Sequence, residues 1–342
     1  MSDRPVSRMR LWYDAFRGFY RKQVDIDKLD AVSRWLYAGR FLILVISAQA
    51  AVIAALLALP SETVNWWYFI PLLAGFLVVH AISNFSNDYF GFMRGHDTPD
   101  SPRVTYTIHP LAHNVLTKSS LKVSIAVLWI VALLVGAFFF WVRGWPVLVL
   151  LAAGAAVLYL YDAAPKSLKA VGLGEVAAFL VWGPLMIGGG YYCLTGTVSW
   201  TAVAASVPYG LGIAGILIGK HVDQAEFDRA HAISTLPVLL GDQGGRLTNQ
   251  IVVVLMYVLI VILVAVGWLG IPVLLVFVAA PRAWTLLRKA SSPRPSEPPE
   301  GYIGWPLWLH RFNLVHNRRF GWMYILGLIL SGVWTLIKGK FF

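Results

Sequence analysis

The chain has 342 residues, of which 58% are hydrophobic and 13% are charged, and its mean hydropathy is +0.66. Because about a quarter of the residues in an ordinary soluble domain are charged, the composition excludes that class and indicates a polytopic membrane protein. No polar stretch is long enough to form a second core, which favours one integral domain. The single cysteine, Cys193, excludes an internal disulfide bond.

The first 40 residues precede any long apolar run and are strongly basic. Apolar and aromatic residues alternate there with basic ones: Leu11, Trp12, Phe16, Phe19 and Tyr20 with Arg10, Arg17, Arg21 and Lys22. This pattern predicts that residues 1–40 form an amphipathic segment at the cytoplasmic interface. The order of basic and apolar residues is not that of a cleaved signal peptide.

Nine apolar segments follow, near residues 41–60, 67–83, 121–141, 145–161, 171–194, 201–219, 250–268, 270–281 and 320–337. All but the eighth reach the roughly 17–25 residues that a membrane-spanning helix needs, and the eighth extends to Leu287. The sequence therefore predicts an all-α fold in which residues 41–342 form one transmembrane domain of nine helices around a central cavity. Several prolines between residues 288 and 305 predict a flexible cytoplasmic loop.

The nine-helix topology separates the basic residues sharply. All but three of the 28 Lys and Arg residues fall on one side, the exceptions being Arg143, Lys338 and Lys340. Because basic loops stay in the cytoplasm, we expect that side to be cytoplasmic. The net charge of +11 is then explained by topology, and we expect no nucleic-acid partner.

A first polar cluster, Asn84–Asp97, ends the second apolar segment. On a helix that continues past Ile82, Asn84, Asn87 and Asp88 share one face. Polar groups at such a position are costly without a partner and indicate a functional site. The long connection after this cluster predicts a partly ordered cap, in which Arg103, His109, His113 and Lys118 are candidate ligand contacts or ordinary cytoplasmic basic residues.

A second polar cluster, Lys220–Arg229, ends the sixth segment and contains Asp223, Glu226 and Asp228. Four spans separate the two clusters, so both face the same side, as do Lys166 and Lys169 after the fourth span. Carboxylate and amide oxygens suit Mg²⁺, which proteins commonly hold with carboxylates and substrate phosphates. A salt bridge would explain one such aspartate, whereas two clusters at equivalent helix ends predict a metal and polyphosphate site.

The motif N-x-x-N-D-Y at Asn84–Tyr89, followed by G-H-D at Gly95–Asp97, resembles the first signature of the UbiA superfamily of membrane prenyltransferases. The stretch from Asp228 to Gly241 resembles the end of its second signature. Together with Pro165–Glu175, these motifs look closest to the 1,4-dihydroxy-2-naphthoate polyprenyltransferase branch. The chain departs from the family at Gly91 and Gln224, where the signatures have aspartates.

The resemblance implies an integral membrane enzyme that moves an isoprenyl chain from its diphosphate to a hydrophobic, aromatic quinone precursor. It implies a Mg²⁺-diphosphate site whose catalytic residues are Asp88, Asp223 and Asp228. The implied metal ligands are Asn84, Asp88, Asp97, Asp223, Glu226 and Asp228. The implied diphosphate contacts are Asn84, Asn87, Arg103, Lys118, Lys169, Lys220, Arg229 and Tyr161. The expected location is the inner, or cell, membrane, with the mouth of the site on the cytoplasmic side.

Two kinds of alternative remain at this point. Within the superfamily, the acceptor can instead be a tetrapyrrole or a lipid alcohol, or the donor can cyclise, because the polar clusters bind only the donor. Outside it, a transporter or a lipid-binding membrane protein would use acidic residues for ion coupling. A transporter predicts acids near the middle of the bilayer, whereas these acids lie at helix ends.

Overall fold

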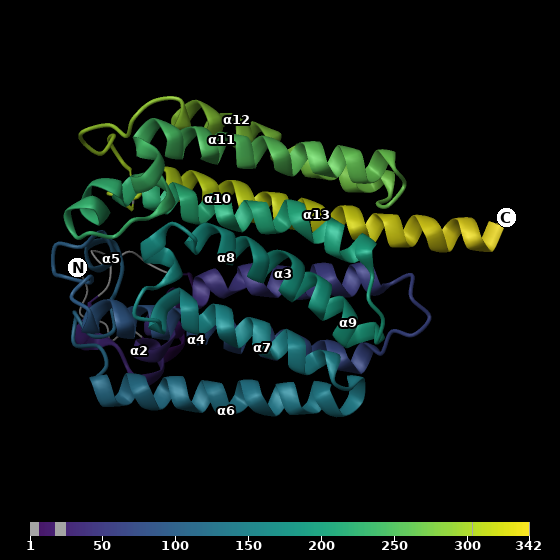
Figure 1. The fold of residues 1–342 in the computed structure, drawn as a ribbon, viewed down its shortest axis with the longest axis horizontal. Helices are drawn as coiled ribbons and strands as arrows, with labels where there is room; N and C mark the ends of the chain where they lie inside the picture. Colours follow the sequence, from purple (N-terminus) through teal and green to yellow (C-terminus); the bar gives the residue numbers. More distant parts are fainter. Residues whose placement is uncertain (1–6, 18–24, 303, 342) are drawn as a thin grey trace.

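The computed structural model describes residues 7–17, 25–302 and 304–341, with side chains described up to residue 334 (Figure 1). Every element in these ranges is helical, which confirms the all-α prediction. The α-helices are α1 (Arg8–Arg17), α2 (Ala31–Ala38), α3 (Val45–Ala58), α4 (Phe69–Met93), α5 (Pro102–Tyr106), α6 (Lys118–Arg143), α7 (Pro146–Leu158), α8 (Gly174–Leu180), α9 (Gly189–Thr195), α10 (Trp200–Ala230), α11 (Leu236–Ala265), α12 (Ala280–Ala290) and α13 (Leu309–Phe341).

Shorter helical turns connect or extend these helices. Those with 3₁₀ geometry are η2 (Ile26–Lys28), η3 (Phe41–Leu44), η4 (Trp66–Tyr68), η6 (Leu168–Val171) and η8 (Ile271–Ala279). Those with π geometry are η5 (Tyr159–Ala163) and η7 (Val181–Gly188). Such π segments are rare and occur frequently at functional sites; both of these border the cavity described below.

Among the described residues, eight continuous helical segments are long and apolar enough to cross a bilayer. They are Phe41–Ala58, Trp66–Met93, Lys118–Arg143, Pro146–Ala163, Gly174–Thr195, Trp200–Ala230, Leu236–Ala265 and Ile271–Ala290, matching the first eight predicted spans. The ninth predicted span falls in α13, whose last side chains lie outside the described part of the chain. The protein is therefore a multi-pass membrane protein.

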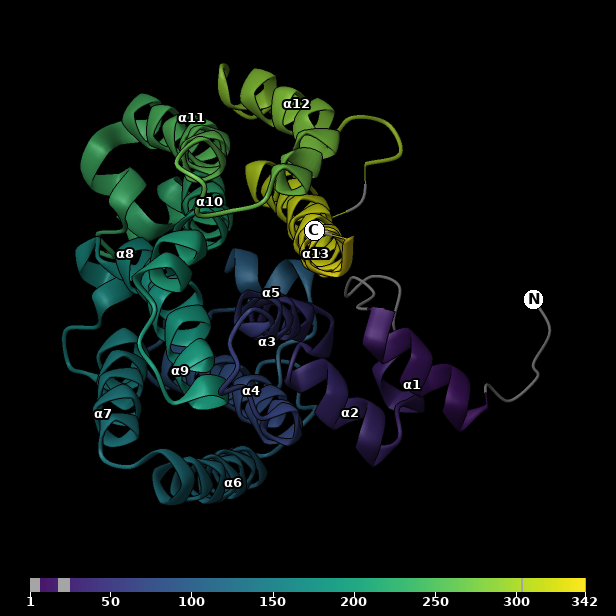
Figure 2. The same cartoon turned by 90° about the vertical axis from the view of Figure 1, so that its right-hand side faces the viewer.

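The long helices run roughly parallel to the long axis, as Figure 1 shows, and Figure 2 shows several of them nearly end-on. The most apolar stretch of α10 is 72% buried, and α10 packs against α8, η7, α11 and α13. The equivalent stretch of α7 is only 11% buried. Helix α10 is thus central, while α6 and α7 lie at the periphery, where their exposed apolar side chains face either the cavity described below or the lipid.

The N-terminal segment packs against the connection that follows α4. Leu29, Leu36 and Tyr37 share an apolar cluster with Ile108 and Val115. The indole of Trp12 on α1 also donates a hydrogen bond to Asp30, at 2.8 Å. The described part of the predicted amphipathic segment therefore contains helix α1, whereas Phe19, Tyr20, Arg21 and Lys22 lie outside the described residues.

The Pro-rich segment 288–305 begins inside α12 and then loses helical structure. Its Arg294 side chain donates hydrogen bonds to the carbonyl oxygens of Asp223, at 3.1 Å, and Pro306, at 2.7 Å. These bonds tie the segment to α10 and to the start of α13. The end of the molecule that carries α5 and these connections is called the α5 end below (Figure 1).

Candidate active site

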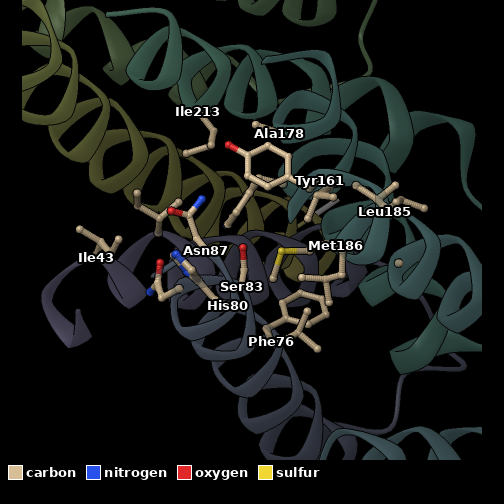
Figure 3. Close-up of a pocket in the computed structure, with 18 of the residues that line it drawn as sticks. Ile43, Phe76, His80, Ser83, Asn87, Tyr161, Ala178, Leu185, Met186 and Ile213 are labelled. Atoms are coloured by element: carbon tan, nitrogen blue, oxygen red, sulfur yellow. The ribbon is translucent and has the colours of Figure 1, made fainter. Parts of the chain in front are cut away.

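A cavity of about 720 Å³ extends from the α5 end into the helix bundle. Its wall is mainly apolar and aromatic, with contributions from α3, α4, α6, α7, η7 and α10. Polar side chains on the wall include Arg40, His80, Ser83, Asn84, Asn87, Tyr161 and Lys220, with Tyr37, Tyr106, Thr107, His310 and Arg311 also bordering the cavity. Figure 3 shows Ser83 and Asn87 on α4 and Tyr161 on η5 bordering this space. The site therefore has a polar mouth above an apolar chamber.

Asp88 is fully buried behind the mouth, where it binds the wall residue Arg40. Arg103 binds it through two hydrogen bonds, Nε to Oδ1 at 3.0 Å and Nη2 to Oδ2 at 2.6 Å. Arg40 donates a further hydrogen bond to Oδ1. Two guanidinium groups on one carboxylate leave a positive excess at the mouth, and planar guanidinium groups are well suited to bind phosphate oxygens.

Arg103 is held by the short helix α5. The Ser101 hydroxyl accepts a hydrogen bond from the backbone N–H of Val104, and Pro102 occupies the first helical position, so both residues favour a helix start here. Burial alone would lower the pKa of Arg103, but the Asp88 carboxylate raises it above the ordinary value. The guanidinium group thus remains charged beside the cavity.

Arg40 was not among the predicted site residues. It stands between α2 and η3 in the left-handed backbone conformation, with φ of 53°, and its Nε is buried without a hydrogen-bond partner among the described residues. The sequence shows it only as one more basic residue before the first span. Its unusual backbone conformation, which turns the chain into the site, is visible only in three dimensions.

Gly91, where the family signature has an aspartate, lies directly beneath Asp97. The chain turns back after α4, and the backbone N–H groups of His96 and Asp97 donate to the Gly91 carbonyl, at 2.9 and 3.3 Å. A Cβ atom at position 91 would lie 2.1 Å from Oδ2 of Asp97. Asp97 thus places its carboxylate where the side chain of residue 91 would begin, which explains how the chain retains a second acid here.

His109 supports this pair of acids. Its Nδ1 accepts hydrogen bonds from the backbone N–H groups of Leu111 and Ala112, so its Nε2 must carry the proton. Nε2 lies 3.2 Å from Oδ2 of Asp97 and 4.0 Å from Oδ1 of Asp88. His109 therefore acts as a donor that fixes the Asp97 carboxylate, rather than as a third ligand.

A third acid, Asp162 on η5, was also missed. It is fully buried; its Oδ1 accepts a hydrogen bond from Asn87, at 2.8 Å, and pairs with Lys169, at 3.1 Å. Its Oδ2 has no hydrogen-bond partner among the described residues. The available signal was its position beside Tyr161, at the same helix end as Lys169.

The α10 side of the site comprises Lys220 and Asp228. Lys220 borders the cavity. Asp228 is buried, accepts a hydrogen bond from the Thr235 hydroxyl at 3.2 Å, and interacts electrostatically with Lys220 and Lys169. On the opposite wall, the Asn84 amide donates to the carbonyl oxygen of Gly39, at 2.9 Å. Residues of both polar clusters, Asn84 and Asn87 from the first and Lys220 from the second, thus border the same cavity.

Asp223 does not point toward this site. Its Oδ2 accepts hydrogen bonds from the backbone N–H groups of Trp308 and His310, at 2.7 and 2.9 Å, and its Oδ1 accepts from Leu309, at 2.9 Å. These are the free amide groups at the start of α13, which a carboxylate satisfies well. The structure therefore assigns Asp223 to the joint between α10 and α13.

Three further predicted residues are exposed on the surface of the molecule and do not line the cavity. Glu226 and Arg229 are exposed on the other face of α10. Lys118 is exposed at the start of α6, with its ammonium group 5.6 Å from the centre of the Phe92 ring. A cation over an aromatic ring is a sufficient local explanation for this lysine.

The donor atoms at the mouth fit Mg²⁺. Ligand atoms of Asp88, Asp97 and His109 lie within 4.8 Å of one another, and the tautomer of His109 leaves the two carboxylates as the metal-binding groups of this trio. Asp162, which accepts a hydrogen bond from Asn87, adds a buried oxygen, Oδ2, without a partner among the described residues. Oxygen-only donors with adjacent cations suit Mg²⁺ bound together with phosphate.

The site thus combines an apolar cavity inside a membrane bundle with carboxylates and guanidinium groups at one end. The profile of the UbiA prenyltransferase family matches residues 48–310, so the chain belongs to this family. It is a membrane prenyltransferase. The predicted family resemblance is confirmed.

Two relatives of this chain are named as enzymes that prenylate or phytylate a naphthalene-type ring. The 1,4-dihydroxy-2-naphthoate octaprenyltransferase of Bacillus subtilis is 22% identical over 284 residues, covering 82% of this chain and 86% of the relative. The 2-carboxy-1,4-naphthoquinone phytyltransferase of a Synechocystis species is 32% identical over 146 residues, covering 43% of this chain and 48% of the relative.

Solved structures agree on the fold. A UbiA homolog from Aeropyrum pernix K1 superposes with a TM-score of 0.63 at 17% identity, covering 83% of this chain and 97% of that one. A UbiA homolog from Archaeoglobus fulgidus, bound to GPP and Mg²⁺, gives a TM-score of 0.58 at 15% identity, covering 86% and 99%.

Proposed function

We propose that this prenyltransferase carries out a Mg²⁺-dependent transfer of an isoprenyl chain from its diphosphate to an aromatic, quinone-precursor acceptor. The observation that carries the proposal is the buried Asp88 carboxylate, held by Arg40 and Arg103 at the mouth of an apolar cavity of about 720 Å³. The solved homolog bound to GPP and Mg²⁺ supports the donor and the metal. The naphthoate enzymes among the relatives support the acceptor class.

The diphosphate binds at the mouth, where charge is available on both sides. Arg40 and Arg103 supply guanidinium donors, and Lys169 and Lys220 supply ammonium groups on the opposite wall. Asp88, Asp97, Asp162 and Asp228, with the amide oxygens of Asn84 and Asn87, are the groups that would hold Mg²⁺. When bound there, Mg²⁺ would offset negative charge on the diphosphate and make it a better leaving group.

The wall below the mouth protects the reacting carbon. As the allylic C–O bond breaks, diphosphate leaves with the electron pair, and positive charge develops on the isoprenyl carbon. The Tyr161 ring borders the cavity next to the mouth (Figure 3), and an aromatic face attracts a cation. The apolar wall keeps water from capturing that carbon before a ring carbon of the acceptor forms the new C–C bond. The ring then regains its aromaticity by releasing the group that this carbon carried, as a proton or, from a carboxylated carbon, as CO₂.

The isoprenyl tail occupies the apolar part of the cavity, between α4, α6, α7 and η7. Phe76, Leu133, Leu151 and Met186 are among the side chains that line this part. We place the enzyme in the cell membrane with the α5 end in the cytoplasm, because the loops at that end carry most of the basic residues.

The proposal is tested with the full chain reconstituted in lipid nanodiscs. The assay offers isoprenyl diphosphates from geranyl to octaprenyl together with 1,4-dihydroxy-2-naphthoate, and it measures diphosphate release and the prenylated product by mass spectrometry. We expect both signals, their loss with EDTA and their return with excess Mg²⁺. Transfer only to a tetrapyrrole or a lipid alcohol, or release of a cyclised hydrocarbon without acceptor, would overturn the acceptor assignment.

A further inference from the structure

His80 is a polar residue deep in the cavity that binding of the diphosphate does not explain. It lies on α4, lines the cavity, and is only 6% exposed (Figure 3). Eight residues separate it from Asp88 on the same helix, a rise of about 12 Å. A titratable side chain inside a membrane-spanning helix normally has a functional partner, and the diphosphate groups at the mouth are too far away to be that partner.

The ring of His80 is held by a short hydrogen-bonded chain. The indole N–H of Trp182 donates to the Ser47 hydroxyl, at 3.0 Å, and Ser47 Oγ lies 2.8 Å from Nδ1 of His80. The rings of His80 and Trp182 also meet edge to face, with centroids 5.0 Å apart. Three elements, α3, α4 and η7, therefore fix one imidazole in a single orientation.

This chain also determines which nitrogen carries the proton. Indole can only donate, so Ser47 Oγ accepts from Trp182. Among the described residues, the only acceptor within reach of the Ser47 hydroxyl proton is Nδ1 of His80. Nδ1 is then the acceptor in that bond, and the neutral ring carries its proton on Nε2.

The Nε2–H group has no hydrogen-bond partner among the described residues, and it is not among their fully enclosed polar atoms that lack one. It therefore remains accessible in a largely apolar cavity. Leaving a donor unpaired there costs free energy that a ligand oxygen would recover. An isoprenyl tail offers no such oxygen, whereas an aromatic acceptor with hydroxyl, carbonyl or carboxylate substituents does.

We propose that His80 is a positioning residue whose Nε2–H binds an oxygen substituent of the aromatic acceptor. This inference rests on the proposed function, because it requires an oxygenated ring as acceptor. With one oxygen held at His80 and the diphosphate held near Asp88, the acceptor ring lies between them along α4. Its reactive carbon then faces the allylic carbon at the level of Asn84 and Tyr161, and Trp182 contacts His80 from the side.

The test compares His80→Leu, which removes the donor, with His80→Gln, whose amide nitrogen can donate from nearly the same place. A matched control is His316→Leu: His316 is also a buried histidine, bonded to Tyr257 at 2.9 Å, and it lies outside the cavity lining. Each variant is assayed with 1,4-dihydroxy-2-naphthoate and with naphthalene analogues that lack one oxygen substituent each.

We expect His80→Leu to raise the KM for 1,4-dihydroxy-2-naphthoate about tenfold to a hundredfold, the range for a lost buried hydrogen bond. The KM for the isoprenyl diphosphate should stay unchanged. In His80→Gln the acceptor KM should return most of the way to the wild-type value, and in His316→Leu it should not change. One analogue should be turned over equally by the wild type and His80→Leu, and this analogue identifies the bound oxygen.

The possible failures are distinguishable. A wild-type protein that transfers nothing to any oxygenated ring contradicts the proposed function itself. An active wild type whose acceptor KM is the same in His80→Leu overturns only the role of His80. If His80→Leu does not fold, Ser47→Ala, which removes the constraint on the ring, replaces it; an unchanged acceptor KM in that variant overturns the inference equally.

Discussion

The first and second polar clusters contain similar residues at equivalent helix ends, but they use their acids differently. In the first cluster, Asp88 is contacted by the charged side chains of Arg40 and Arg103. In the second, Asp223 is bonded to three backbone amides of α13. Side-chain partners can turn toward a ligand, whereas backbone amides at a helix start stay in place. The partner, more than the acid itself, therefore determines whether a carboxylate is available for a metal.

The largest expected effect on turnover comes from replacing Asp88, the central acid of the first cluster. We expect Asp88→Asn to lower turnover at least about a thousandfold, because the variant loses a buried charge that holds both arginines and the metal. Diphosphate release in nanodiscs is the measurement. Size-exclusion chromatography of the variant shows whether it remains folded, and a folded variant with normal turnover would contradict the assignment of Asp88.

Position 91 tests whether Asp97 substitutes for the family aspartate. Gly91→Ala places a Cβ against the Asp97 carboxylate, and we expect a loss of about a hundredfold in kcat/KM because misplaced catalytic groups are costly. The double variant Gly91→Asp with Asp97→Gly moves the acid onto the helix, and we expect it to be more active than Asp97→Gly alone. Activity in the double variant no higher than in Asp97→Gly alone would show that the two positions are not interchangeable.

Arg103→Lys retains the charge at the mouth but loses the two-pronged hydrogen bond with Asp88. A lysine is a point charge that cannot reproduce that geometry. We expect the KM for the isoprenyl diphosphate to rise about tenfold, with the KM for the acceptor unchanged. Steady-state kinetics with each substrate varied separately measures this, and equal changes in both KM values would indicate a general structural defect.

Asp223→Asn should affect stability more than catalysis. The amide oxygen of asparagine can accept only some of the three backbone hydrogen bonds that the carboxylate accepts, so we expect a loss of about 2 kcal/mol in the free energy of unfolding. We expect at most about a threefold loss in the turnover of folded protein. Thermal melting in detergent measures the first and diphosphate release the second. If Asp223→Asn lost turnover as completely as Asp88→Asn while melting normally, the distinction between the two clusters would be wrong.

The smallest effects belong to the exposed charges. Lys118→Ala, Glu226→Ala and Arg229→Ala should each change kcat/KM by less than about threefold, because surface charges interact weakly through water. The same kinetic assay checks all three. A large loss in any one of them would show that its side chain reaches the diphosphate during the reaction.

Much of the fold follows from the sequence because length and apolar composition alone define a membrane-spanning helix. The spacing of Asn84, Asn87 and Asp88 also predicts one shared helix face, and the structure places Asn84 and Asn87 on the cavity wall and Asp88 against the wall residue Arg40. The family membership was readable from the motifs. These predictions depend on the local order of apolar and polar residues, which can be taken directly from the sequence.

In the second cluster, the prediction overlooked how the three acids are distributed around the helix. At 100° per residue, Asp223 and Asp228 lie roughly 140° apart around a helix, and Glu226 lies roughly 200° from Asp228. Three acids at this spacing cannot share a face, so the helical period already separates Asp228 from the other two. Arg40 and Asp162 differ, because a left-handed residue and a π segment bring them to the site, and neither feature has a simple sequence signal.

Two side chains near the end of α4, Arg94 and Asn87, limit how far the two walls of the mouth can separate. Arg94, at the end of α4, donates hydrogen bonds to the carbonyl oxygens of Asp162, Ala163 and Ala164, where the fourth span ends. Asn87 on the same helix donates a further hydrogen bond to the Asp162 carboxylate, at 2.8 Å. A headgroup wider than this bonded entrance therefore passes only if the bonds of Arg94 and Asn87 break.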